Sequence, residues 1–180
     1  MQTHELTAHP VSPPLAVSRV AVRARLLGRW VQMRWRVEGS AKLVLPPFTG
    51  RQRRDGLWRT TCFEMFAQTR GQAGYAEYNL SPSEAWAAYD FSGPREGMAE
   101  RALSHDPVLT PRFTRGILVF DAAIPLADLP AQPLALGLTA VLEEEGGVHS
   151  YWAVKHGDPA KPDFHDPACF ALRLEPPAGP

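Results

Sequence analysis

Residues 17–37, with the sequence VSRVAVRARLLGRWVQMRWRV, contain two alternating runs separated by Gly28. In the first run (17–27), every second residue from Val20 onward is apolar, and arginines fill most of the positions between. The second run (29–37) repeats this alternation. Successive side chains of a β-strand point to opposite faces, so each run predicts a strand with one buried and one polar, largely basic face. The glycine between the runs predicts that the two strands form a hairpin.

The same rhythm continues along the rest of the chain. Its 18 prolines and 14 glycines separate short runs rich in Val, Leu, Phe, Tyr and Trp, and no run has a convincing helical period. Further strands are expected at residues 42–45, 58–68, 74–80, 84–91, 111–115, 116–124, 134–144, 149–154 and 168–174. We predict an all-β fold, a two-sheet antiparallel β-sandwich of the immunoglobulin-like or jelly-roll type, with under about a tenth of its residues in helix.

Length and composition suit one domain, expected over residues 1–175 with a disordered tail at 176–180. The 19 Lys and Arg balance the 19 Asp and Glu, so the chain lacks the positive field that attracts nucleic acid. No stretch reaches the ~20 apolar residues of a membrane span, and no secretion signal is evident, so the cytoplasm is the expected location. Cys62 and Cys169 are then expected to be buried free thiols. The sequence does not indicate an oligomeric state.

Three consecutive expected strands, at 58–68, 74–80 and 84–91, carry polar and aromatic side chains at alternating positions. If they pair as a meander, carboxylates, an amide and aromatic rings share one surface. Such a surface suits a sugar, because an aromatic face packs on a pyranose while carboxylates and amides bond its hydroxyls. The alternative is a solvated sheet face with scattered aromatics, or rings that belong to the core. The expected ligand-binding residues are Glu64, Glu77, Asn79, Trp86, Trp152, His156, Trp58 and Arg95.

Glu64 lies in the otherwise apolar run Cys62–Phe66. A buried carboxylate needs a partner, which is either an arginine such as Arg59 or Arg95, or a ligand hydroxyl or metal. Glu64 and Glu77 could also form a glycosidase pair across a bound glycosidic bond. The chain has no nucleophile elbow, glycine-rich phosphate loop or His-Glu-x-x-His motif, so we predict binding without catalysis.

A further group of polar residues lies near the C-terminal end of the chain, at His156, Asp158, Asp163 and His165. Such residues can bind metal, but their spacing matches no tight zinc pattern. The segment that carries them is proline-rich. An ordinary hydrogen-bonded loop is the favoured interpretation, and no metal is predicted.

Three motifs together resemble the bacterial DOMON-like proteins. They are LWRTTCFEMF at 57–66, YAEYNLSPSEAWAAYDF at 75–91, and SYWAVKH at 150–156 followed by KPDFH at 161–165. That family is related to the ninth-family carbohydrate-binding modules and to the cytochrome-type DOMON domains, and the resemblance covers nearly the whole chain. It implies a two-sheet β-sandwich with a site for a sugar or for haem.

The haem-binding relatives use a methionine and a histidine as axial ligands of the iron. Met65 is expected to face the core, whereas Met98 lies in a loop that could cover a site. The available residues are Met65, Met98, His149, His156 and His165. We predict a sugar-binding module without a cofactor, with haem or metal binding as the alternative and a protein-interaction module with an empty site as the third.

Overall fold

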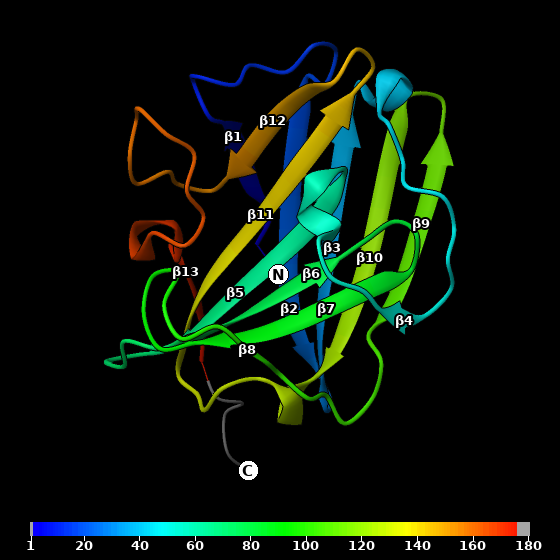
Figure 1. Ribbon diagram of the computed structural model, residues 1–180. Coiled ribbons are helices and arrows are strands. Elements are labelled where there is room, and N and C mark those ends of the chain that lie inside the picture. Colours follow the sequence, from blue (N-terminus) through cyan, green and yellow to red (C-terminus); the bar gives the residue numbers. More distant parts are fainter. Residues whose placement is uncertain (1, 176–180) are drawn as a thin grey trace.

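The computed structural model describes residues 2–175, which form thirteen β-strands (Figure 1). The expected tail at 176–180 lies outside the described residues. The strands are β1 (His4–Ala8), β2 (Arg19–Leu27), β3 (Trp30–Glu38), β4 (Gln52–Arg53), β5 (Cys62–Thr69), β6 (Tyr75–Leu80), β7 (Ala85–Phe91), β8 (Ala99–Glu100), β9 (Val108–Thr114), β10 (Ile117–Pro125), β11 (Leu134–Glu144), β12 (Val148–Ala153) and β13 (Leu172–Leu174).

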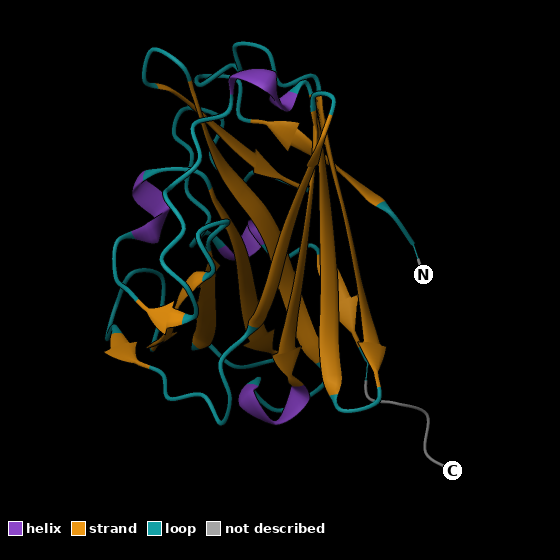
Figure 2. Ribbon diagram, turned by 90° about the vertical axis from the view of Figure 1, so that its right-hand side faces the viewer, coloured by secondary structure: helices purple, strands orange, loops and turns teal. Residues whose placement is uncertain are grey.

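Eleven of the strands form one continuous path in the order β4-β7-β6-β5-β11-β12-β1-β2-β3-β10-β9. Strand β8 pairs with β7, and β13 pairs with β11. All these pairs are antiparallel except β4 with β7. The path curls so that its two halves face each other as two layers of strands (Figures 1 and 2).

Strand β1 joins the two halves into a single curled sheet. His4–Leu6 pair with β2, whereas Thr7 and Ala8 pair with β12. The expectation of two separate sheets is therefore not confirmed. This joining strand was not predicted from the sequence, because its five residues, HELTA, are too few and too polar to show a clear alternation.

The core lies between the two halves of the sheet. The Phe63 ring on β5 lies 4.5 Å from the Phe120 ring on β10 and 5.3 Å from the Trp35 ring on β3, measured between ring centroids. All three side chains are buried. The predicted β2–β3 hairpin is confirmed, with its apolar positions in this core and its arginines on the outer face.

Helical structure is minor in the described part of the chain, with four 3-10 helices of three residues each and no α-helix. The expected strand at 42–45 is replaced by the 3-10 helix Ser40–Lys42 and a single bridge from Leu43 to Glu144. The expected strand at 58–68 begins four residues later, because Leu57–Arg59 form a 3-10 turn. No described helix is long and apolar enough to span a membrane.

Glu144, at the end of β11, fastens the segment that precedes β2. Its fully buried carboxylate accepts hydrogen bonds from the backbone N–H groups of Leu15, Ala16 and Val17 at 2.6, 2.6 and 3.0 Å. Three donors on one carboxylate satisfy buried groups that would otherwise lack partners.

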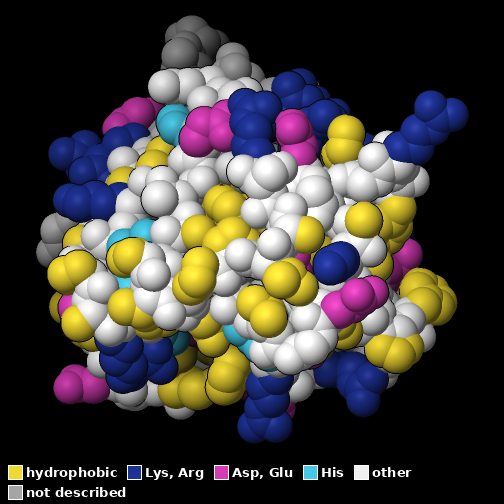
Figure 3. All heavy atoms as spheres, turned by 90° about the horizontal axis from the view of Figure 1, so that it is seen from above, with side chains coloured by type: hydrophobic (Ala, Val, Ile, Leu, Met, Phe, Trp, Pro, Cys, Tyr) yellow, Lys and Arg dark blue, Asp and Glu magenta, His cyan; other side chains and the backbone are white. Residues whose placement is uncertain are grey.

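Seen from above, the upper end of the molecule carries apolar side chains over much of its middle and most of its Lys and Arg side chains at the margin (Figure 3).

Candidate functional site

A cavity of ≈ 1090 Å³ lies on the outer face of β5, β6, β7 and β11, on the side of the sheet away from the core. The segment between β12 and β13 covers part of this face, where the Phe170 ring stacks 5.7 Å from Phe66 and the Phe164 ring lies 6.1 Å from Tyr151. This segment is orange to red in Figure 1. The loop after β7 contributes Arg95 and Met98 to the cavity wall.

Strand register brings Glu64 and Glu77 to this cavity. Glu64 pairs with Asn79 and Phe66 with Glu77 across β5 and β6, so even positions of β5 share a face with odd positions of β6. Both carboxyls line the cavity, although Glu64 is only 3% exposed and Glu77 6%. The predicted meander of these strands and the shared face of the two glutamates are confirmed.

Each of the two carboxyls has one neutral hydrogen-bond donor from the sheet. Thr139 Oγ1 donates to Glu64 Oε2 at 3.1 Å, and Asn79 Nδ2 donates to Glu77 Oε1 at 2.8 Å. Burial raises the pKa of Glu64 to about 8, with the nearby charge of Glu77 as a second cause. Burial also raises the pKa of Glu77, to about 7. Burial therefore favours the protonated form of both carboxyls, and a protonated carboxyl can both donate and accept hydrogen bonds.

His165 lies between Glu77 and the aromatic wall. The backbone N–H of Arg95 donates to the Tyr75 hydroxyl at 3.2 Å, and that hydroxyl lies 2.7 Å from His165 Nδ1. If the hydroxyl donates to Nδ1, the ring proton sits on Nε2, which faces Glu77 Oε2 at 3.7 Å. Burial, together with the charge of Arg95, lowers the pKa of His165 to about 4, so this ring is neutral at neutral pH.

Aromatic and charged side chains form the opposite wall. The Tyr89 hydroxyl donates to Asp55 Oδ1 at 2.5 Å, and Arg53 Nη1 donates to the same oxygen at 2.9 Å. The Arg53 guanidinium also lies 5.3 Å from the centre of the Tyr89 ring. Trp58, which is 51% exposed, presents an indole at the rim with the Arg59 guanidinium 5.6 Å from its ring centre.

Trp86 is not on the predicted face. It pairs with Leu80 across β6 and β7, whereas Glu77 pairs with Tyr89, so the odd positions of β7 face the cavity and Trp86 points into the core. Trp152 also packs in the core, and its indole donates to Ser150 Oγ at 2.9 Å. The prediction that these two indoles lie on the same face of the sheet as the glutamates is wrong. Alternation separates the two faces of one strand, but it does not determine which of them lies on the same side of the sheet as a given face of the neighbouring strand.

The remaining predicted residues divide between the cavity and its surroundings. Trp58 and Arg95 line the cavity, and Asn79 adjoins it through its bond to Glu77. Arg95 Nη2 pairs with Asp163 Oδ1 at 2.8 Å rather than with either glutamate. His156 does not line the cavity, and its Nε2–H donates to the Thr7 carbonyl oxygen at 2.8 Å. Their roles in binding a ligand stay predictions.

The sequence analysis did not select Tyr89, Asp55 or Thr139, which shape the cavity or its carboxyls. Tyr89 could have been found had the register of β6 and β7 been known, since it directly opposes Glu77. Asp55 and Thr139 come from a distant loop and a distant strand, and no local pattern marks them.

The residues considered for haem or metal are dispersed. Met65 is buried in the core, as expected, whereas Met98 and His165 both line the cavity. Within residues 2–175, no group of three or more His, Cys, Asp or Glu side chains is arranged to hold a metal ion. Cys62 and Cys169 are buried free thiols, as predicted.

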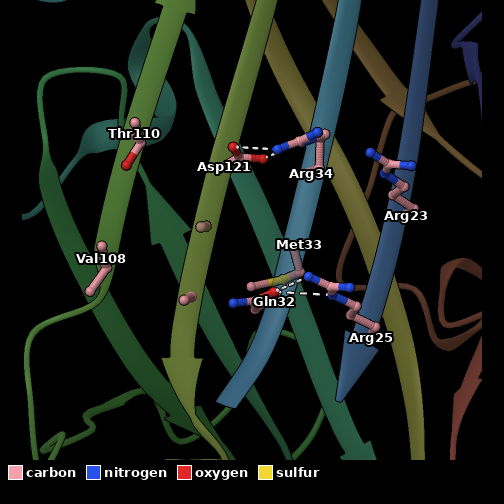
Figure 4. A pocket seen from close by; sticks show the side chains of 10 residues that line it. Arg23, Arg25, Gln32, Met33, Arg34, Val108, Thr110 and Asp121 are labelled. Carbon is pink, nitrogen blue, oxygen red and sulfur yellow. Dashed lines mark hydrogen bonds and ion pairs between the residues drawn. The ribbon is translucent and has the colours of Figure 1, made fainter. Parts of the chain in front are cut away.

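A second hollow, of ≈ 430 Å³, lies on the outer face of the other half of the sheet (Figure 4). Arg34 forms two hydrogen bonds with Asp121 there, at 2.5 and 2.8 Å, and Arg25 bonds Gln32. Arg23 lies opposite Arg34 across β2 and β3. This hollow is therefore basic, in contrast to the carboxyl-lined cavity on β5 and β6.

No protein-family model matches the sequence, and no curated protein matches it. Solved structures do resemble the fold. A protein from Bacteroides uniformis, provisionally described as carbohydrate-binding, matches with a TM-score of 0.66 and 14% identity over 97% of this chain and 86% of the other. A family 9 carbohydrate-binding module from Caldicellulosiruptor kristjanssonii, solved in complex with cellotriose, matches with a TM-score of 0.55 and 10% identity over 97% and 84%. These similarities show a shared fold.

Proposed function

We propose that this chain is a non-catalytic carbohydrate-binding module whose site is the cavity on the outer face of β5, β6 and β7. The observation that carries the proposal is the pair of buried carboxyls, Glu64 and Glu77, at the floor of a cavity with aromatic walls. Small-ligand sites commonly combine an apolar surface with a few convergent polar groups.

The two kinds of side chain have different roles in holding a sugar. The exposed indole of Trp58 offers a flat apolar surface for the C–H face of a pyranose. Glu64 and Glu77, buried below it, offer donors and acceptors for ring hydroxyls, and the apolar surroundings make unpaired polar groups costly. A sugar that pairs these groups is therefore favoured over water and over apolar ligands.

The shared fold supports the proposal by analogy, since the two similar structures are described as carbohydrate-binding. The motifs that resemble DOMON-like proteins imply a sugar or haem as the ligand, so they include this ligand class without selecting it. Analogy of fold is a weaker support than the residues of the site, because one fold hosts many functions.

Isothermal titration calorimetry with glucose, xylose, mannose and their β-linked di- and trisaccharides tests the proposal. We expect at least one of them to bind and to raise the melting temperature by mass action. Trp58→Ala should weaken that binding by about tenfold or more. The matched control is Phe48→Ala, which removes another exposed ring, 74% exposed, that does not line the cavity.

Two results would count against the proposal. If no saccharide in the panel binds, the cavity is not a sugar site. If nitrophenyl glycosides are hydrolysed at a rate that Glu64→Gln abolishes, the chain is an enzyme rather than a binding module.

A further inference from the structure

The two carboxyls of the cavity have no cationic partner among residues 2–175. Neither Glu64 nor Glu77 forms an ion pair with a described Lys or Arg side chain. The charge of Arg95 on the cavity wall acts on both carboxyls from a distance and lowers the pKa of each, but its guanidinium is paired with Asp163 at 2.8 Å. His165 faces Glu77 but is neutral at neutral pH, because burial lowers its pKa to about 4.

Glu64 is the least satisfied of these groups. Its side chain is 3% exposed and lines the cavity, and the only hydrogen bond that it accepts from a described residue reaches Oε2, from Thr139. Its other oxygen, Oε1, has no such partner. Asn79, which bonds Glu77, also has a buried Oδ1 without a hydrogen-bond partner. Glu64 Oε1 is therefore available to bond a ligand in the cavity.

A positive charge placed at this floor would be favoured for two reasons. An opposite charge within ~4–6 Å stabilises an ionised carboxylate, and an ammonium group supplies three N–H donors to carboxylate oxygens that carry no proton once they are ionised.

We propose that the preferred ligand is an amino sugar with a free, protonated amine, held with its ammonium group between Glu64 and Glu77. This inference rests on the proposed carbohydrate-binding function. Binding converts the protonated carboxyls of the free protein into carboxylates that face the ammonium group. The protons that leave them pass to the buffer, so binding at neutral pH releases protons.

This inference is tested by calorimetry with three sugars that differ only at carbon 2, namely glucose, glucosamine and N-acetylglucosamine. The β-1,4-linked dimers of these sugars repeat the comparison. At pH 7 we expect the amine to bind about tenfold or more tighter than the other two. Titrations in buffers of different ionisation enthalpy should give a net proton release for the amine and close to none for glucose.

Variants show whether the two glutamates cause this preference. Glu64→Gln and Glu77→Gln should each reduce the ratio of amine to glucose affinity toward one. The control is Glu38→Gln, which removes a carboxylate that does not line the cavity and that pairs with Arg36 at 3.0 Å. Its ratio should stay near that of the unaltered protein. Circular dichroism and melting curves verify that each variant folds. Proton release is measured on the unaltered protein, so that test does not depend on the folding of any variant.

The outcomes separate the two proposals. Binding of neutral sugars with no gain from the amine overturns this inference and leaves the proposed function standing. An amine preference that persists in both glutamine variants, or that Glu38→Gln removes equally, also overturns it. If no saccharide binds, the proposed function fails and this inference fails with it.

Discussion

Glu77 and Tyr89 lie directly opposite each other across β6 and β7, and this register turns Trp86 into the core. Trp86→Ala should therefore destabilise the fold by about 3–5 kcal/mol, because it opens a cavity between the two halves of the sheet. Chemical denaturation measures the change. Trp58→Ala, which removes an exposed ring, should cost less than about 1 kcal/mol.

Trp86→Phe gives a second check of the same point. The indole nitrogen of Trp86 is buried without a hydrogen-bond partner among the described residues, so phenylalanine keeps most of the packing and removes an unsatisfied donor. This variant should be clearly more stable than Trp86→Ala. Equal stability of the two variants would mean that Trp86 does not pack in the core.

Stability should fall as pH rises through the range set by Glu64 and Glu77. Burial raises the pKa of Glu64 from 4.5 to about 8 and that of Glu77 from 4.5 to about 7. Between the unfolded value of 4.5 and these raised values, the folded protein binds more protons than the unfolded chain. The contribution of this pair to the free energy of unfolding is therefore largest below about pH 4.5. It decreases as the pH rises toward 8, by on the order of a few kcal/mol.

Denaturation curves at pH 5 and pH 8.5 measure this dependence, and Glu64→Gln should flatten it. The glutamine variant should also be more stable than the unaltered protein at pH 8.5, because it removes a buried charge. A profile that rises between pH 5 and 8 and is unaffected by Glu64→Gln would contradict the assigned surroundings of the pair.

Glu144→Gln should loosen the segment before β2. An amide retains one oxygen but places an NH₂ group against backbone N–H donors, so at least one of the three bonds from Leu15, Ala16 and Val17 is lost. We expect a cost of about 2–4 kcal/mol and faster amide exchange at residues 15–17. The neighbouring Glu143→Gln, on a side chain that faces outward, should change stability by less than about 0.5 kcal/mol.

Tyr89→Phe should raise the pKa of Asp55. The Tyr89 hydroxyl is the largest cause that lowers the pKa of this carboxyl, followed by the hydrogen bond from Arg53. Nuclear magnetic resonance titration of the Asp55 side chain measures the change. An unaltered pKa would show that the hydroxyl does not bond Asp55 in solution.

The sequence predicted those features that a strand determines by itself. The β2–β3 hairpin, its buried face and the bounds of β11 follow from alternation and from the turn residues beside them. Glu64 and Glu77 were placed together correctly, because a short linker joins β5 and β6.

The orientation of β7 was not predictable in the same way. It depends on the turn Ser81–Glu84, in which the Ser81 N–H bonds the Ala85 carbonyl and Glu84 adopts a φ of 68°. A turn with one residue more or fewer would have reversed the facing of Trp86 and Tyr89. Likewise, His165 reaches the cavity only because the segment between β12 and β13 folds back over the sheet, which no local pattern encodes.

The pairing of β1 with both β2 and β12 has a consequence for the order in which the molecule folds. Thr7, near the start of the chain, pairs with Ala153, so the two halves of the sheet cannot be joined along this edge until the chain has been synthesised past β12. The β2–β3 hairpin can form early because its partners are adjacent, but the joining pairs are among the most distant in sequence. On the ribosome, this edge therefore stays open until residue 153 has been synthesised, and the pairing of β1 with β12 follows the formation of the local hairpins.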